Sequence, residues 1–160
     1  MLMVEQDSLS IPDQFAAIAA ESHGPVERAD HGVRFHAILD GVTYKSIAYF
    51  IEDAVILHIP IITFLNRERV IEIVLLLNYL NLSIPFGNFE LIDGEEAVSV
   101  RYRSGFFCGE GVVRPEDFAT AMVWADFFMK KFRGALESVS SGFADVLSVI
   151  EKLESDDKSN

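Results

Sequence analysis

The sequence predicts an α+β domain in which helices pack on one face of an antiparallel sheet. Its 160 residues, half of them apolar, suit a single domain with its own core. Apolar residues alternate with period two in stretches 33–39 and 98–102, each beside an Asp-Gly pair typical of hairpin turns. They recur with helical spacing in stretches 70–80 and 115–132. The expected order is helix, three or four strands, helix, hairpin, helix, helix.

The first half of the chain accounts for one helix and a meander. Pro12 and Asp13 favour the start of a short helix, and Gly24 favours its end. Pro60 lacks a backbone N–H, so we expect it to end its strand or to lie at a sheet edge. The strands of the meander are expected at residues 33–39, 42–51 and 54–61.

The next helix has two apolar sides. Asn66 is a plausible N-cap for it. The stripe expected to face the sheet consists of Val70, Ile73, Val74, Leu77 and Leu80. The other side, with Leu75, Leu76 and Tyr79, is apolar as well. Another helix of the chain, a second copy or a protein client could cover it, and the sequence leaves these three alternatives open.

Pro115 marks the start of a long helix that follows the second hairpin. Its main apolar face consists of Phe118, Ala121, Met122, Ala125, Phe128, Met129 and Phe132. Val123, Trp124 and Phe127 lie nearly opposite and form a second apolar surface. We expect a last helix, after a break at Ser141 and Gly142, to cover the surface around Trp124. The single domain then spans residues 11–153, and residues 154–160 form a flexible acidic tail.

Charge and composition exclude several classes of protein. The net charge of −12 repels nucleic acid and anionic membrane surfaces. The first residues are acidic and lack the basic start and apolar run of a signal peptide. The longest predominantly apolar segment has only 12 residues, too few to span a membrane. The single cysteine, Cys108, cannot form an intramolecular disulfide. We therefore expect a cytoplasmic protein with neither nucleic acid nor membrane as a partner.

Motifs for catalysis, cofactors or metals are missing from the sequence. The glycine-rich segment 105–111 lacks the lysine and hydroxyl of a P-loop and the spacing of a dinucleotide fingerprint. His31 and His36 point to opposite faces if both lie on one strand, which is poor geometry for one metal ion. Arg101 and Arg103 share the polar face of their strand. They could bind an acidic group or pair across strands with Glu90.

The segment NYLNLSIPFGNFELIDG, residues 78–94, carries a family resemblance. A helix that runs into L-N-x-L-N, a Phe-Gly-x-Phe turn and an acidic-Gly hairpin resembles the YbjN family of small bacterial proteins. The resemblance rests on Leu77, Asn78, Leu80, Asn81, Phe86, Gly87, Phe89, Asp93, Gly94, Val98, Val100 and Tyr102. It implies a fold similar to that of type III secretion chaperones and a regulatory role in sensory transduction, without established catalytic residues.

Two hypotheses for function follow. The first is a non-enzymatic binding module, chaperone-like or regulatory. It would form a homodimer and hold a protein client or partner through Leu75, Leu76, Tyr79, Val123, Trp124 and Phe127. The second is a regulator that binds a small molecule or anion in a pocket between sheet and helices, with Arg101 and Arg103 as its polar lining. Neither requires a cofactor or a metal ion.

Overall fold

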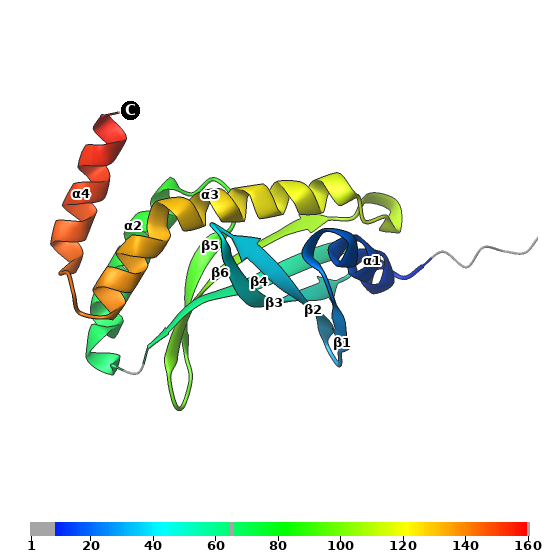
Figure 1. The fold of residues 1–160 in the computed structure, drawn as a ribbon, viewed down its shortest axis with the longest axis horizontal. Helices are drawn as coiled ribbons and strands as arrows, with labels where there is room; N and C mark the ends of the chain where they lie inside the picture. The colour runs from blue at the N-terminus through cyan, green and yellow to red at the C-terminus, as the bar shows by residue number, and fades with distance from the viewer. Residues whose placement is uncertain (1–8, 65, 160) are drawn as a thin grey trace, which may run out of the picture.

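A computed structural model describes residues 9–64 and 66–159 (Figure 1). Its elements follow the predicted order, with a fourth short strand, β1, ahead of the meander. Their bounds are α1 (Ile11–His23), β1 (Glu27–Ala29), β2 (Gly32–Leu39), β3 (Val42–Ile51), β4 (Ala54–Phe64), α2 (Val70–Ser83), β5 (Asn88–Asp93), β6 (Val98–Phe107), α3 (Pro115–Ser140) and α4 (Val146–Lys158). Short 3₁₀ turns span Arg67–Arg69 and Gly109–Gly111.

The strands form one antiparallel sheet in the order β1-β2-β3-β4-β6-β5. The expected turn between β2 and β3 is present, with Asp40 and Gly41 both at positive φ. Helices α1, α2 and α3 pack against one face, along which α3 extends, whereas α4 packs on α2 and α3 (Figure 1). The predicted fold class is therefore confirmed.

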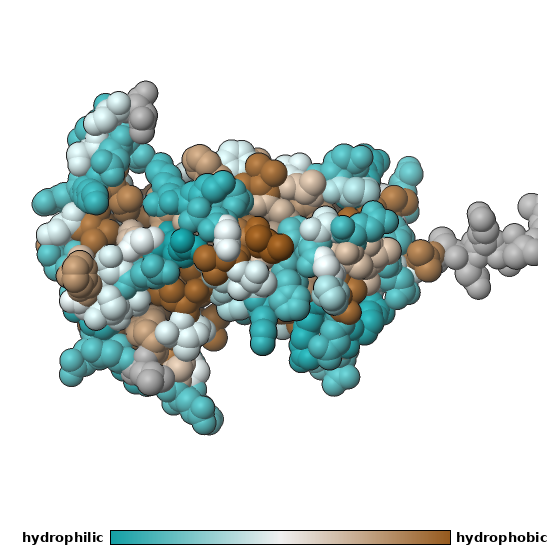
Figure 2. All heavy atoms as spheres, viewed as in Figure 1, coloured by the Kyte–Doolittle hydropathy of each residue, from teal (hydrophilic) through white to brown (hydrophobic). Residues whose placement is uncertain are grey.

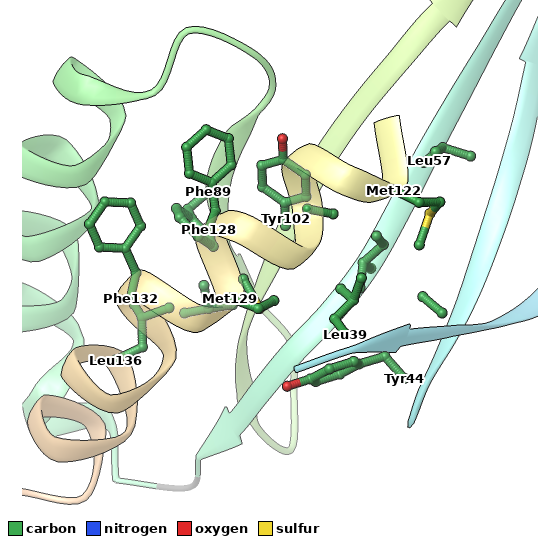
Figure 3. Packing of buried hydrophobic residues seen from close by; sticks show 14 of the residues in the cluster. Leu39, Tyr44, Leu57, Phe89, Tyr102, Met122, Phe128, Met129, Phe132 and Leu136 are labelled. Atoms are coloured by element: carbon green, nitrogen blue, oxygen red, sulfur yellow. The ribbon is translucent and has the colours of Figure 1, made fainter. Parts of the chain in front are cut away.

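The core lies between α3 and the sheet. On α3, Phe128 lies close to Tyr102 and Phe89 of the strands, and Met129, Phe132 and Leu136 continue the buried cluster along the helix (Figure 3). The Phe128 and Tyr102 ring centroids are 5.9 Å apart. This is the face that the helical spacing predicted for the segment that starts at Pro115.

Pro60 does not end its strand, which was one of its two expected positions. Strand β4 continues through it to Phe64 and lies between β3 and β6 in the sheet. The β3 ladder, however, ends at the pair Ile47 and His58, so β4 has a neighbour only on the β6 side at Pro60. The register also shifts between Pro60 and Ile62. Pro60 thus sits on a locally free edge, where its missing N–H costs no ladder hydrogen bond.

Helix α2 faces the core with a different stripe from the predicted one. Ile73, Leu76, Leu77 and Leu80 are buried, whereas Val74 is exposed. The expectation that Leu76 belongs to an outer binding surface is therefore wrong, because its side chain has no exposed area at all. Helix α4 contacts α2 and covers part of its outer side. Leu75 remains half exposed and Tyr79 is half buried.

Asn81 anchors α2 to the edge strand β5. Its amide nitrogen donates to the Phe89 carbonyl oxygen at 2.9 Å, and the Phe89 N–H donates to its Oδ1 at 2.8 Å. The side chain therefore pairs with the free edge of β5 as a neighbouring strand would. Gly87 has φ 71° and passes so close to β6 that a Cβ would lie 2.4 Å from the Arg103 carbonyl oxygen.

The last helix differs from the expected one in where it ends and in what it covers. Residues 154–158, predicted to be a flexible tail, continue α4 as regular helix to Lys158. Asp157 near its end forms an ion pair with Lys131 of α3 at 2.7 Å. The helix stands out at the end of the molecule farthest from α1 (Figure 1). It does not cover Val123 or Phe127, which stay exposed, so the cover expected from this helix is missing there.

Candidate functional site

Two surfaces of the chain combine exposure with chemistry that suits binding. The first, here called the α3 apolar patch, consists of Val123, Trp124 and Phe127 of α3 together with Phe86 from the turn between α2 and β5. The second, here called the open face, is the side of the sheet turned away from the helices. It consists of Arg34, His36, Lys45, Ile47, Tyr49, Ile56, His58, Arg101 and Arg103.

The α3 apolar patch is a cluster of aromatic rings fixed on the core. Phe127, Phe86 and Val123 are 51, 56 and 68% exposed. The Trp124 ring lies between them, with centroids 5.1 Å from Phe86 and 6.0 Å from Phe127. It also stacks on the buried Phe128 at 5.6 Å. The patch is thus held in place by a core residue beneath it. Apolar side chains reach the surface in patches between hydrophilic ones in Figure 2.

A small hollow adjoins this patch. It has a volume of 210 Å³ and is lined by residues that include Phe86, Tyr102, Phe106 and Trp124. The Tyr102 hydroxyl donates to the Phe86 carbonyl oxygen at 2.7 Å and so fixes one wall. Burial raises the pKa of Tyr102 to about 12, which keeps this donor protonated.

The open face carries two adjoining hollows of about 690 and 770 Å³. They share Tyr49, His58 and Arg101, and Arg103 lines the second. Both arginines therefore lie on the face opposite the helices, and not in the expected pocket between sheet and helices. Strand alternation explains this, because Tyr102 between them points into the core.

Glu90 on β5 holds both arginines. Arg101 donates through Nε to Oε2 of Glu90 at 2.8 Å, and its Nη2 lies 2.7 Å from the same oxygen. Arg103 reaches the other carboxylate oxygen at 3.3 Å. Burial by itself raises the pKa of the Glu90 carboxyl group, but the hydrogen bonds from Arg101, Asn88 and Arg103 and the charge of Arg101 together lower it. The cross-strand pairing with Glu90, one of the two expected roles, is thus present, and it leaves donors of Arg103 free.

His58 lies at the centre of the open face. Its ring centroid is 4.9 Å from that of Tyr49. Partial burial and then the positive charge of Arg101 lower the pKa of the imidazole, although Glu90 acts in the opposite direction. The neutral form is therefore favoured near pH 7. Sequence reasoning missed this cluster, because only the strand register brings His58 and its neighbours together.

Cys108 is buried, and its surroundings disfavour the thiolate form. Burial, followed by the charges of Asp117 and Asp53, raises the pKa of the Cys108 thiol, which disfavours a nucleophilic thiolate. The 105–111 segment is held against α1, where Gln14 donates to the Gly111 carbonyl oxygen at 3.0 Å. Within residues 9–64 and 66–159, no group of three or more His, Cys, Asp or Glu is arranged to hold a metal ion. None of the described helices has the length and apolar character required to cross a bilayer.

The fold of this chain is similar to that of a solved structure. No protein-family model matches the chain, and no curated protein matches it in sequence. The crystal structure of YbjN from E. coli, a protein proposed to regulate transcription, superposes with a TM-score of 0.60. The match covers 82% of this chain and 94% of YbjN, at 15% sequence identity. The fold is YbjN-like. At this identity the likeness concerns the fold alone.

Proposed function

We propose that this chain is a non-enzymatic protein-binding module that pairs with a second copy of itself through the α3 apolar patch. The observation that carries the proposal is the exposure of Val123, Phe127 and Phe86 around one anchored tryptophan. Aromatic side chains are enriched at the centres of protein interfaces. Contiguous exposed apolar surface of this kind commonly marks a contact site.

The patch and its hollow suit an interface between identical copies. In a twofold dimer each surface must fit itself, so a protruding side chain needs a recess nearby on the same surface. Phe127 is half exposed and can reach a partner, and the 210 Å³ hollow is lined in part by Trp124. The hollow has room for one partner side chain, whereas small-molecule sites occupy roughly 300–1,000 Å³. We therefore place Phe127 of each copy at the hollow of the other.

Preorganisation favours this use of the patch. Trp124 is stacked on buried Phe128, so its ring loses little further rotational freedom on association. The net charge of −12 opposes association of two copies at low salt. Added salt screens that repulsion and leaves apolar contacts intact, so the dimer should tighten as ionic strength rises.

Light scattering behind size exclusion tests the proposal on the wild type, Phe127→Asp and Phe143→Asp. Phe143 lies in the turn after α3 and is 89% exposed, so it is a matched control for an exposed phenylalanine outside the patch. We expect Phe127→Asp to weaken dimerisation at least tenfold, which corresponds to about 1.4 kcal/mol, and Phe143→Asp to leave it unchanged.

Circular dichroism confirms that each variant is folded. A wild type that stays monomeric up to about 100 μM, where micromolar dimers are well populated, would overturn the proposal. Equal weakening by both substitutions would also count against it, because the effect would then come from added charge alone. Leu76→Asp is unsuitable for this purpose, since Leu76 is buried in the core.

A further inference from the structure

The open face differs in charge from the rest of the molecule. The chain has 25 acidic residues and 13 Lys and Arg. Around the two hollows this balance is reversed. The basic residues there are Arg28, Arg34, Lys45, Arg101 and Arg103. The acidic ones are Glu27 and Asp30, together with Asp13 and Glu90, which form ion pairs with Arg28 and Arg101. A basic surface on an acidic protein attracts an anionic partner specifically to that surface.

We propose that the open face binds an acidic protein segment in extended conformation, with two carboxylates four residues apart and an apolar side chain midway between them. This site lies on the side of the sheet away from α3 and is independent of the proposed dimer contact. A peptide assay can therefore succeed or fail whatever the oligomeric state.

The spacing of the cations sets the spacing of the carboxylates. Arg34, Ile47, His58 and Arg103 form one row across β2, β3, β4 and β6, as the strand registers give it. Adjacent strands are about 4.8 Å apart, so the two arginines are separated by ~14 Å at the backbone. An extended chain rises about 3.4 Å per residue, and side chains two residues apart share a face. Carboxylates at positions i and i+4 therefore reach both ends of the row.

The middle of the row favours an apolar side chain at position i+2. Ile47 and His58 occupy the two central places and are half buried, and the Tyr49 ring packs on His58. A residue at i+2 lies ~7 Å from each carboxylate position, above the boundary between Ile47 and His58. Burial of its apolar surface there adds affinity without requiring a further charge.

The arginines at the two ends remain available to a ligand. Arg103 makes one contact of 3.3 Å with Glu90, and the five N–H groups of a guanidinium leave other donors for a carboxylate. Arg34 lies 3.4 Å from Glu27, with both side chains mostly exposed. Exposed ion pairs of this kind contribute little net stability, so an incoming carboxylate can replace such a partner at small cost.

Fluorescence anisotropy with a labelled synthetic peptide tests the inference. The probe is a seven-residue peptide with Glu at positions 2 and 6, Leu at position 4, and Ser or Gly elsewhere. The protein variants are Arg34→Glu and Arg103→Glu, with Lys152→Glu as control, since Lys152 is exposed on α4. We expect each open-face reversal to weaken binding at least tenfold and the control to bind as the wild type does.

A second peptide of the same composition with its two Glu residues adjacent tests the spacing. We expect it to bind at least tenfold more weakly than the first. Absence of binding by the first peptide, equal binding of both peptides, or equal loss in the Lys152→Glu control would each overturn the inference. Displacement of the peptide by inorganic phosphate, succinate or a short single-stranded oligonucleotide at equal concentration would also overturn it, in favour of that other class of ligand.

Discussion

The two faces of the sheet consist of the same strands and yet differ in almost every physical property. On β4, Val55, Leu57 and Ile59 have no exposed area, and helices cover them. Ile56 and His58 lie between them in the sequence and face the open side. Successive side chains of a strand point to opposite faces, so one residue step separates a core position from a binding position. Every second side chain of a strand can therefore be charged without weakening the core.

The sharpest test of this division compares Leu57→Ala with Ile56→Ala. Leu57 is fully buried, so its truncation leaves a cavity and should lower the free energy of unfolding by about 2–5 kcal/mol. Ile56 is half buried on the open face, and we expect a loss of about 1 kcal/mol or less. Urea denaturation followed by circular dichroism measures both. Similar losses for the two variants would mean that something also covers the open face.

The same contrast occurs on α2 with two asparagines. Asn81→Ala removes both hydrogen bonds to the backbone of Phe89 and leaves the β5 edge without its partner. We expect a loss of about 1–3 kcal/mol in the free energy of unfolding. Asn78 is exposed one turn earlier, and Asn78→Ala should change stability by about 0.5 kcal/mol or less. If Asn81→Ala is as mild as Asn78→Ala in the same urea assay, the β5 edge does not depend on that side chain.

These asparagines also show which features of the fold can be predicted from the sequence and which cannot. Alternation, Asp-Gly turns and Pro115 were enough to predict the order of elements, because each is a local signal. The partner of Asn81 lies eight residues away on another element, and no local pattern points to it. The helical stripe of α2 was misjudged for a related reason. The helix is apolar on nearly all sides, so its burial is decided by where α3 and α4 pack.

The two candidate surfaces also differ in how much of each can be predicted from the sequence. Val123, Trp124 and Phe127 were singled out by helical spacing, since a second apolar side on one helix can be read from a single segment. Arg101 and Arg103 were also identified, but their position opposite the helices depends on which residues of β6 face α3. Arg34 and His58 join them only through the order β2-β3-β4-β6, and strand order is a long-range property.

A tyrosine pair gives the smallest and most specific test of the two faces. Tyr102 is buried against α3 and donates to the Phe86 carbonyl oxygen, whereas Tyr49 lies on the open face. At pH 7 we expect Tyr102→Phe to lower the free energy of unfolding by about 1 kcal/mol. We expect a change of about 0.5 kcal/mol or less for Tyr49→Phe. Urea denaturation measures both.

The pH dependence of stability isolates the phenol of Tyr102. Folding raises its pKa from 10.0 to about 12, so between these values the folded state retains a proton that the unfolded state has lost. Its contribution to stability is complete below pH 10 and disappears as the pH rises toward about 12. Urea denaturation at pH 9, 10 and 11 should therefore give a steeper decline for the wild type than for Tyr102→Phe. Equal slopes would mean that water reaches this hydroxyl, and that the covered face is less completely sealed beside Phe86 than its burial indicates.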